Sequence, residues 1–396
     1  MTSERSIRSL GVTLVEVIFS MGVVLIGLLG VMSILPLAGN RAKDAVGLSV
    51  ASALADNVME EMLAQRWLSS GRLATFDDKG DLMPFDGSRP FCIDPAFASI
   101  GGRQVAVSPN PLNSYDTRFF PFYKETHNPT LDPSVSGSTE LSVNPQRMLR
   151  VGILQRSSSL GAPLTLLTRD QALRVADSPD DLLIERPKAR TDNPFMLGVQ
   201  ATIAGLPYGG RFGSGDFSWL ATVSPNSSPE YVTVSVAVIR NRQRGFSVPV
   251  RQALNPEQNA TDERMATISF TSGFRGGAGG SIELNGAENT VSRLRVGDWL
   301  MLSRSGANIL VNRWYRVAAV EREVEKLVVP RNEIGHQSTN TASRPVWRRR
   351  VYLDGPDFPF RGVINPSNQI QTTDTLAVLV DGVVSVTEHV VRLRDL

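Results

Sequence analysis

One acidic residue lies within a long apolar run near the start of the chain. Glu16 follows residues 12–15 (VTLV) and precedes residues 17–38, none of which carries a charge. A carboxylate costs ~2.5–3.5 kcal/mol at the centre of a bilayer and less near its edge. Glu16 is therefore either a helix-start residue, stabilised near water by the helix dipole, or the counterion of a cationic group. A free α-amino group, whose ordinary pKa is ~7.7–8.0, is one such cation.

Other residue types that support catalysis or metal binding do not form a recognisable site. His127, His336 and His389 have no second histidine at helical spacing and no glutamate in a metal-binding pattern. Cys92 is the only cysteine, which excludes an intramolecular disulfide and any zinc site with two or more cysteines. No G-x-S-x-G nucleophile motif is present. We therefore predict that the protein is not an enzyme and has no catalytic residues, metal ligands or cofactor.

Two loop-like patterns have a chemical and a structural interpretation. Asp77, Asp78 and Asp81 surround Gly80 with loosely calcium-like spacing, but the later bidentate glutamate of a full calcium loop is missing. A plain acidic turn is therefore favoured. Residues 273–280 (GFRGGAGG) are glycine-rich but lack the Lys-Ser/Thr of a phosphate loop, which favours a flexible turn.

A basic segment could in principle contact nucleic acid. Residues 348–350 are three arginines, with Trp347 before them and Tyr352 shortly after, and aromatic stacking with positive charge is typical of single-strand binding. A solvated strand face explains the same pattern. The chain has 41 Lys+Arg and 39 Asp+Glu, a net charge of +2, so there is no global field that would attract nucleic acid. We expect no nucleic-acid partner.

The apolar run itself is long enough to span a membrane. At ~1.5 Å per residue, helical residues 17–38 would extend about 33 Å, against about 30 Å for a hydrocarbon core. The run has no polar stripe, which a buried core helix would normally show. A cleaved signal peptide is the competing interpretation, but its apolar region is shorter and precedes the cleavage site, whereas Gly11 lies before this run. Counting basic residues on the two sides does not determine the direction of the span.

The segment Gly11-Val12-Thr13-Leu14-Val15-Glu16, followed by the apolar run, resembles the N-terminus of type IV pilins and pseudopilins. The resemblance implies a cytoplasmic leader at residues 1–11, removed by prepilin peptidase after Gly11. It also implies N-methylation of Val12, and a Glu16 carboxylate that neutralises the amine of a neighbouring subunit during assembly. This chain departs from the family in having valine at position 12, where phenylalanine is usual, and in placing the helix-kink proline, Pro36, further along.

The resemblance also implies a function and a location. The protein would be a minor pilin or pseudopilin, a non-enzymatic filament subunit of a type IV pilus or a type II secretion system. It would lie in the inner membrane as a single-pass protein, with its N-terminus in the cytoplasm and its C-terminal bulk outside. Its partners would be prepilin peptidase, other pilin or pseudopilin subunits, the inner-membrane assembly platform and membrane lipid. The alternative is a membrane-anchored binding or adhesion protein that does not polymerise.

The helix is expected to continue beyond the membrane. Apolar residues recur with a period of four at Val46, Val50, Leu54, Val58 and Met62, filled in by Ala53, Leu63 and Trp67. We therefore predict a long bent helix over residues 12–70, interrupted near Gly27, Gly30 and Pro36 and stopped at Gly71. Its apolar stripe is expected to pack against the chain's own sheet; contact with a partner's helix is the lesser alternative.

The rest of the chain is expected to be rich in β-strands. Residues 71–250 would form a pilin-like globular domain, with proline-rich loops over residues 72–145 and strands at 148–155, 195–204, 219–224 and 231–239. The last strand alternates valine with Tyr, Thr, Ser and Ala, which predicts one buried apolar face. The predicted class is α+β: a long transmembrane and amphipathic N-terminal helix on an antiparallel sheet, plus an additional barrel- or sandwich-like region.

That additional region is assigned to residues 251–396. Short strands are expected at 266–271, 281–285, 298–303, 314–321, 326–329, 346–353 and 376–380. Asp381-Gly382 predicts a hairpin in which residues 383–391 pair back on residues 376–380. The region would be either an insertion or an accessory head domain.

Overall fold

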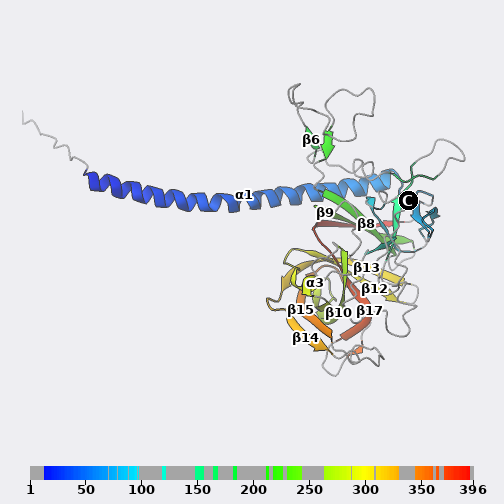
Figure 1. Cartoon of the computed structure of the whole chain (residues 1–396). Helices are drawn as coiled ribbons and strands as arrows, with labels where there is room; N and C mark the ends of the chain where they lie inside the picture. Colours follow the sequence, from blue (N-terminus) through cyan, green and yellow to red (C-terminus); the bar gives the residue numbers. More distant parts are fainter. Residues whose placement is uncertain are drawn as a thin grey trace, which may run out of the picture. The chain divides into compact units, whose positions relative to one another are not determined.

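The structure is a computed structural model, shown in Figure 1. It describes residues 13–69, 71–77, 79–87, 89–95, 97, 118–121, 148–155, 164–167, 182–184, 211–213, 217–225, 230–242, 263–286, 288–306, 309–329, 344–359, 363–364 and 370–392. The chain divides into two units, Met1–Ser49 and Val50–Leu396. The strand expected at residues 195–204 lies outside the described residues.

The N-terminal helix, α1, runs from Leu14 to Ala64 as one element. It continues through Gly27, Gly30 and Pro36, so the interruption predicted there is absent. Proline lacks one backbone N–H, but the hydrogen bonds of the flanking turns remain, and strong helix formers such as leucine surround it.

The helix ends earlier than predicted, through a Schellman motif. The N–H of Trp67 donates to the carbonyl of Met62 at 3.0 Å, and that of Arg66 to the carbonyl of Leu63 at 3.2 Å. Arg66 takes the left-handed conformation, with φ of 52°, that glycine usually provides. The predicted stop at Gly71 is therefore wrong, because an arginine occupies the position at which a sequence search looks for glycine.

A first sheet has the strand order β18-β9-β8-β3-β5-β1-β2, with β4 pairing with β5. Its strands are β1 (Leu73–Phe76), β2 (Leu82–Phe85), β3 (Phe91–Ile93), β4 (Phe119–Phe120), β5 (Met148–Ile153), β8 (Phe217–Pro225), β9 (Tyr231–Arg240) and β18 (Val383–Arg392). Only the β3–β5 pairing is parallel among those described. Strands β1 to β4 fall where we predicted loops, because such short segments show no recognisable period. A separate pair joins β6 (Leu182–Ile184) to β7 (Arg211–Gly213).

A second sheet closes into a six-stranded barrel (Figure 1). The ring consists of β10 (Glu263–Gly273), β11 (Gly280–Gly286), β15 (Arg344–Asp354), β13 (Ile309–Val320), β12 (Trp299–Gly306) and β17 (Ile370–Val380), and it closes where β17 pairs with β10. Strand β14 (Glu325–Val329) pairs with β15, β16 (Val363–Ile364) pairs with β17, and the short helix α3 (Glu288–Ser292) follows β11. Of the two predicted architectures for this region, the barrel is confirmed.

The last strand does not form the predicted hairpin. Strand β18 pairs antiparallel with β9 of the first sheet, with Val391 opposite Val232. Both sides of β17 are already occupied, by β12 and β10, so β17 offers β18 no free edge. Residues 381–382 do form a turn, with Gly382 at φ of 80°, but this turn carries the chain from the barrel to the sheet. The barrel strands are thus inserted between β9 and β18, and the predicted 376–391 hairpin is wrong.

Both faces of the first sheet are buried, which corrects a second prediction. Val234, Val236 and Val238 of β9 lie in one apolar cluster with residues of α1, including Val58 and Met62. The opposite face of β9 contributes Ala237 and Ile239 to another apolar cluster, whose barrel members include Met265, Met301 and Trp314. Strand β9 was predicted to have one buried face. Its small Thr, Ser and Ala residues instead form the face on which the barrel packs.

The apolar stripe of α1 is buried only where the helix packs against the first sheet. Leu54, Val58 and Met62 are buried as members of the cluster with the sheet strands. Val46 and Leu63, which were also assigned to the stripe, are exposed. Leu63 directly follows the buried Met62, so at 3.6 residues per turn its side chain points about 100° away from the buried one.

The conformation of Arg66 gives a test of this fold. A non-glycine residue in the left-handed region is strained by ~1–2 kcal/mol, and part of the gain from glycine is lost to the more flexible unfolded chain. Arg66→Gly should therefore raise the free energy of unfolding by ~0.5–1 kcal/mol. Denaturant unfolding of the whole protein in detergent measures this. Ala64→Gly, at the last helical residue, should lower it instead; equal effects of the two substitutions would contradict the assigned helix end.

Candidate functional site

The N-terminal part of α1 could span a membrane. Leu14–Pro36, 23 residues, is long and apolar enough to do so, and none of its most apolar stretch is buried in the protein. Its large apolar side chains are exposed, for example Phe19 at 73% and Ile26 at 72%. Such a surface is stable in lipid or against other apolar helices, because the exposure of a large apolar surface to water is unfavourable.

The predicted processing and assembly residues lie at the start of this segment. Glu16 is in the first turn of α1 and is exposed. The carbonyl of Thr13 accepts hydrogen bonds from the backbone N–H groups of Glu16, at 3.0 Å, and Val17, at 3.2 Å. Gly11 and Val12 lie outside the described residues. The side chain of Glu16 is therefore placed at the helix N-terminus, where a negative charge is favoured.

Arg348, Arg349 and Arg350 of β15 all have partners within the barrel. Arg350 pairs with Glu283 of β11 at 3.0 Å, and Nε of Arg348 donates to the side-chain oxygen of Asn285 at 3.0 Å. Arg349 donates to carbonyl groups at the end of α3, including that of Leu294 at 2.9 Å. These contacts make the arginines part of the barrel's own packing, which agrees with the interpretation as a strand face.

The glycine-rich segment 273–280 binds an internal carboxylate. It connects β10 to β11, and the backbone N–H groups of Gly276 and Gly277 donate to Asp357 at 3.1 and 2.7 Å. A Cβ atom at Gly279 would lie 2.0 Å from the carbonyl oxygen of Leu353, so no other residue fits there. The segment is a tight turn bound to the neighbouring strand connection, and its donors are used by the protein itself.

The acidic residues after β1 form a turn. Oδ1 of Asp77 accepts hydrogen bonds from the backbone N–H groups of Lys79 and Asp81, both at 2.8 Å. These bonds, foremost that from Asp81, hold the pKa of Asp77 below its ordinary value. Asp78 lies outside the described residues. The carboxylate of Asp77 thus closes the β1–β2 hairpin, as expected for an acidic turn.

Other candidate residues show no reactive arrangement. Cys92 is completely buried, and burial raises the pKa of its thiol to about 12. His389 is exposed on β18, whereas His127 and His336 lie outside the described residues. Among the residues that the structure describes, no group of three His, Cys, Asp or Glu side chains could hold a metal ion.

Four charged side chains form a buried ion network that sequence reasoning missed. Arg150 of β5 is completely buried and pairs with Asp94, which follows β3, and with Glu263, the first residue of β10, at 2.7 Å. Arg242, which follows β9, pairs with the same two carboxylates, at 2.7 Å to Asp94 and 2.9 Å to Glu263. Among the described residues, two cations thus pair with two anions.

Each charge of this buried ion network depends on the charges that pair with it. Burial lowers the pKa of Arg150, and the negative charge of Glu263 acts in the opposite direction. Removing one member of a buried pair leaves an uncompensated charge, which costs about 3–5 kcal/mol.

The sequence contained one signal of this network, which is Arg150 inside the apolar segment MLRVGILQ. A lone arginine in a buried strand requires an anion, but the sequence does not say which one.

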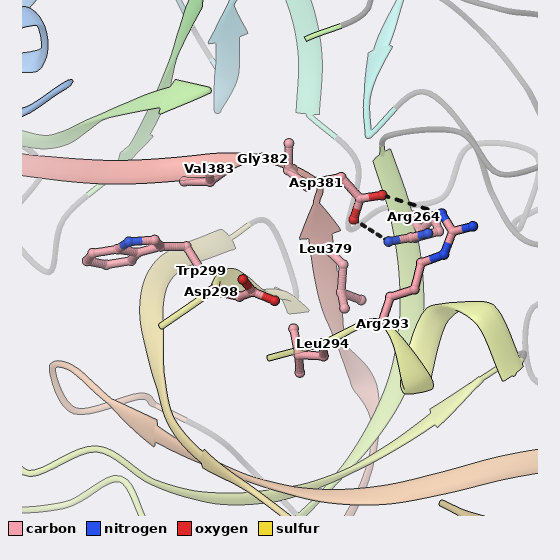
Figure 2. A pocket seen from close by; sticks show the side chains of 10 residues that line it. Arg264, Arg293, Leu294, Asp298, Trp299, Leu379, Asp381, Gly382 and Val383 are labelled. Atoms are coloured by element: carbon pink, nitrogen blue, oxygen red, sulfur yellow. Dashed lines mark hydrogen bonds and ion pairs between the residues drawn. The ribbon is translucent and has the colours of Figure 1, made fainter. Parts of the chain in front are cut away.

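A small pocket lies where the chain passes from β17 to β18 (Figure 2). Asp381 pairs there with Arg264, whose side chain is buried, and lies 4.0 Å from Nη1 of the more exposed Arg293. Leu294, Leu379 and Trp299 supply apolar walls. The pocket brings charged groups into internal pairs around the connection, and its lining includes no nucleophile next to a base.

Comparisons with known proteins identify no relative. No family model, no curated protein and no solved structure matches this chain.

Asp77 provides a pH-dependent test of the turn. Its pKa is lower in the folded chain than the ordinary ~3.9 of the unfolded chain, so the stability it adds is present above that value and is lost as the pH falls through the folded pKa. The difference in unfolding free energy between the wild type and Asp77→Ala should therefore shrink between about pH 5 and pH 2. Urea unfolding at several pH values measures it. Asp77→Asn keeps the acceptor but cannot titrate, so its difference from Asp77→Ala should stay constant with pH.

Proposed function

We propose that this protein is a minor pilin or pseudopilin, a non-enzymatic subunit of a type IV pilus or type II secretion filament. The observation that carries the proposal is the order of residues at the N-terminus: a short basic leader, Gly11, Val12, and Glu16 at the beginning of a long apolar run. Each of these features is common by itself. The combination of a leader, a cleavage glycine, an acidic residue at a fixed distance and a retained span is specific for a prepilin-like N-terminus.

The exposed apolar surface of α1 supports the proposal. The described residues of Leu14–Pro36 expose large apolar side chains, a surface that lipid or the helices of other subunits would cover. A filament subunit meets both environments in turn, lipid before assembly and neighbouring helices after it. The exposed carboxylate of Glu16 in the first turn is accessible to a partner in either case.

The mechanism would be electrostatic. Cleavage after Gly11 would leave Val12 with a free amine, which is largely protonated at neutral pH and stays basic after methylation. In the filament, the Glu16 carboxylate of one subunit would pair with that amine on its neighbour. The low dielectric of a helix bundle makes an isolated charge costly, so each of the two charges would require the other.

The same proposal assigns the partners and the location. Prepilin peptidase would process the chain at the inner membrane, with the N-terminus in the cytoplasm and Val50–Leu396 on the opposite side. The assembly platform and other pilin or pseudopilin subunits would then receive it from the lipid bilayer.

A membrane-anchored binding protein that does not polymerise is the second candidate. The specific observation that favours it is the barrel inserted between β9 and β18, which adds a complete folded module to the first sheet. An anchor and a binding module would account for both parts of the chain without assembly.

Mass spectrometry of the protein from its native membrane distinguishes the two candidates. The expected mature chain begins at Val12 and carries one added methyl group, and both changes should be lost in cells without prepilin peptidase. Gly11→Val should block cleavage, whereas Gly22→Ala, a matched substitution within the span, should leave it intact. A chain that keeps residues 1–11 in peptidase-competent cells would make the anchored binding protein the better explanation.

Glu16 tests the assembly step separately. Glu16→Ala should lower incorporation into purified filaments at least tenfold, because the amine of the neighbour loses its counterion, while membrane insertion and cleavage remain normal. Quantitative immunoblotting of filament and membrane fractions measures both. Glu60→Ala, which removes an exposed glutamate from the same helix outside the span, serves as the control. Normal incorporation of Glu16→Ala would refute the mechanism.

A further inference from the structure

The interface between the barrel and the first sheet combines an apolar cluster with polar contacts. Phe120, Met148 and Leu220 of the first sheet share the cluster with the barrel residues Leu376 and Val378. Apolar contact drives two surfaces together but is not directional, so it does not by itself fix one docked position.

Polar contacts across the interface are directional. Indole Nε1 of Trp314, on β13, donates to Oγ1 of Thr222, on β8, at 3.1 Å, and both side chains are buried. Arg313, next to it on β13, pairs with Glu388 of β18 at 3.1 Å. The buried ion network adds its four charges on the same side of the sheet, because its member Arg150 stacks over the ring of Phe120 at 5.5 Å.

The buried ion network also lies at the connection between the two sheets. Arg242 is the second residue after the end of β9, and Glu263 is the first residue of the barrel. At the return connection, Asp381 pairs with Arg264, which is adjacent to Glu263. Both points at which the chain crosses between sheet and barrel are therefore held by buried or half-buried ion pairs.

Among the residues that the structure describes, the two carboxylates of the network come from different modules. Asp94, Arg150 and Arg242 belong to the first sheet and its strand ends, and the barrel supplies the fourth charge, Glu263. If the barrel shifted while this site stayed closed to water, Arg150 and Arg242 would lose their pairs with Glu263. A buried cation without its anion is strongly unfavourable, so the docked position is favoured over small displacements that keep the site closed to water.

We propose that the buried ion network of Asp94, Arg150, Arg242 and Glu263 is a lock that holds the barrel on the first sheet as one rigid body. The barrel is then a fixed extension of the sheet and not a tethered domain, despite its origin as an insertion. This inference holds whether or not the chain is a filament subunit, and its test does not involve assembly.

Cys92 offers a direct measurement of the docked state. It is the only cysteine of the chain, it is completely buried, and it belongs to the cluster that joins sheet and barrel. A thiol reagent can react with it only when this interface opens. In the full-length protein in detergent, Glu263→Gln should increase the rate of native-state Cys92 labelling at least tenfold over the wild type. Glu230→Gln, which removes an exposed ion pair with Arg392, should leave the rate unchanged.

Two further measurements separate undocking from general destabilisation. Amide hydrogen exchange of the β11 and β15 strands, which pair within the barrel, should remain as slow in Glu263→Gln as in the wild type. Adding Arg242→Gln to Glu263→Gln restores one cation to one anion and should return Cys92 labelling toward the wild-type rate. The proposal is overturned if Glu263→Gln labels no faster than Glu230→Gln, if the barrel amides lose protection together with Cys92, or if the double variant labels faster than Glu263→Gln alone.

Discussion

The structure of Val50–Leu396 depends on covering both faces of the first sheet. Strand β9 is buried on both sides, by α1 over its valines and by the barrel over its small residues. A sheet with one covered face would leave Leu220, Ala237 and Ile239 in water. The barrel therefore completes the hydrophobic core of the chain as well as forming a module of its own.

Charge determines where the barrel sits, since apolar burial alone is not directional. Arg150 is the central residue, because a completely buried guanidinium must be neutralised. It receives one carboxylate from its own sheet, Asp94, and one from the barrel, Glu263. A single side chain on β5 thereby connects the packing of the sheet to the placement of an insertion that begins far away in the sequence.

The two ends of α1 serve different requirements. Its first part exposes apolar residues and one carboxylate, and it is long and apolar enough to span a membrane. Its last turns are buried against strands and end in a Schellman motif beside Met62 and Trp67. One continuous helix thus combines an exposed apolar segment with a segment that is buried against the chain's own strands, an arrangement that suits the proposed membrane-anchored filament subunit.

The sequence by itself determined the features that depend on neighbouring residues. The apolar span, the position of Glu16, most of the longer strands and the acidic turn at Asp77 all follow from local composition and spacing. What only the tertiary structure decided involves partners distant along the chain: the pairing of β18 with β9, the second buried face of β9, and the anions of Arg150. A turn such as Asp381-Gly382 reverses the chain but cannot specify which strand it pairs with, because that depends on which edges remain free. Likewise, a buried arginine predicts that a carboxylate must exist, while only the fold selects Asp94 and Glu263.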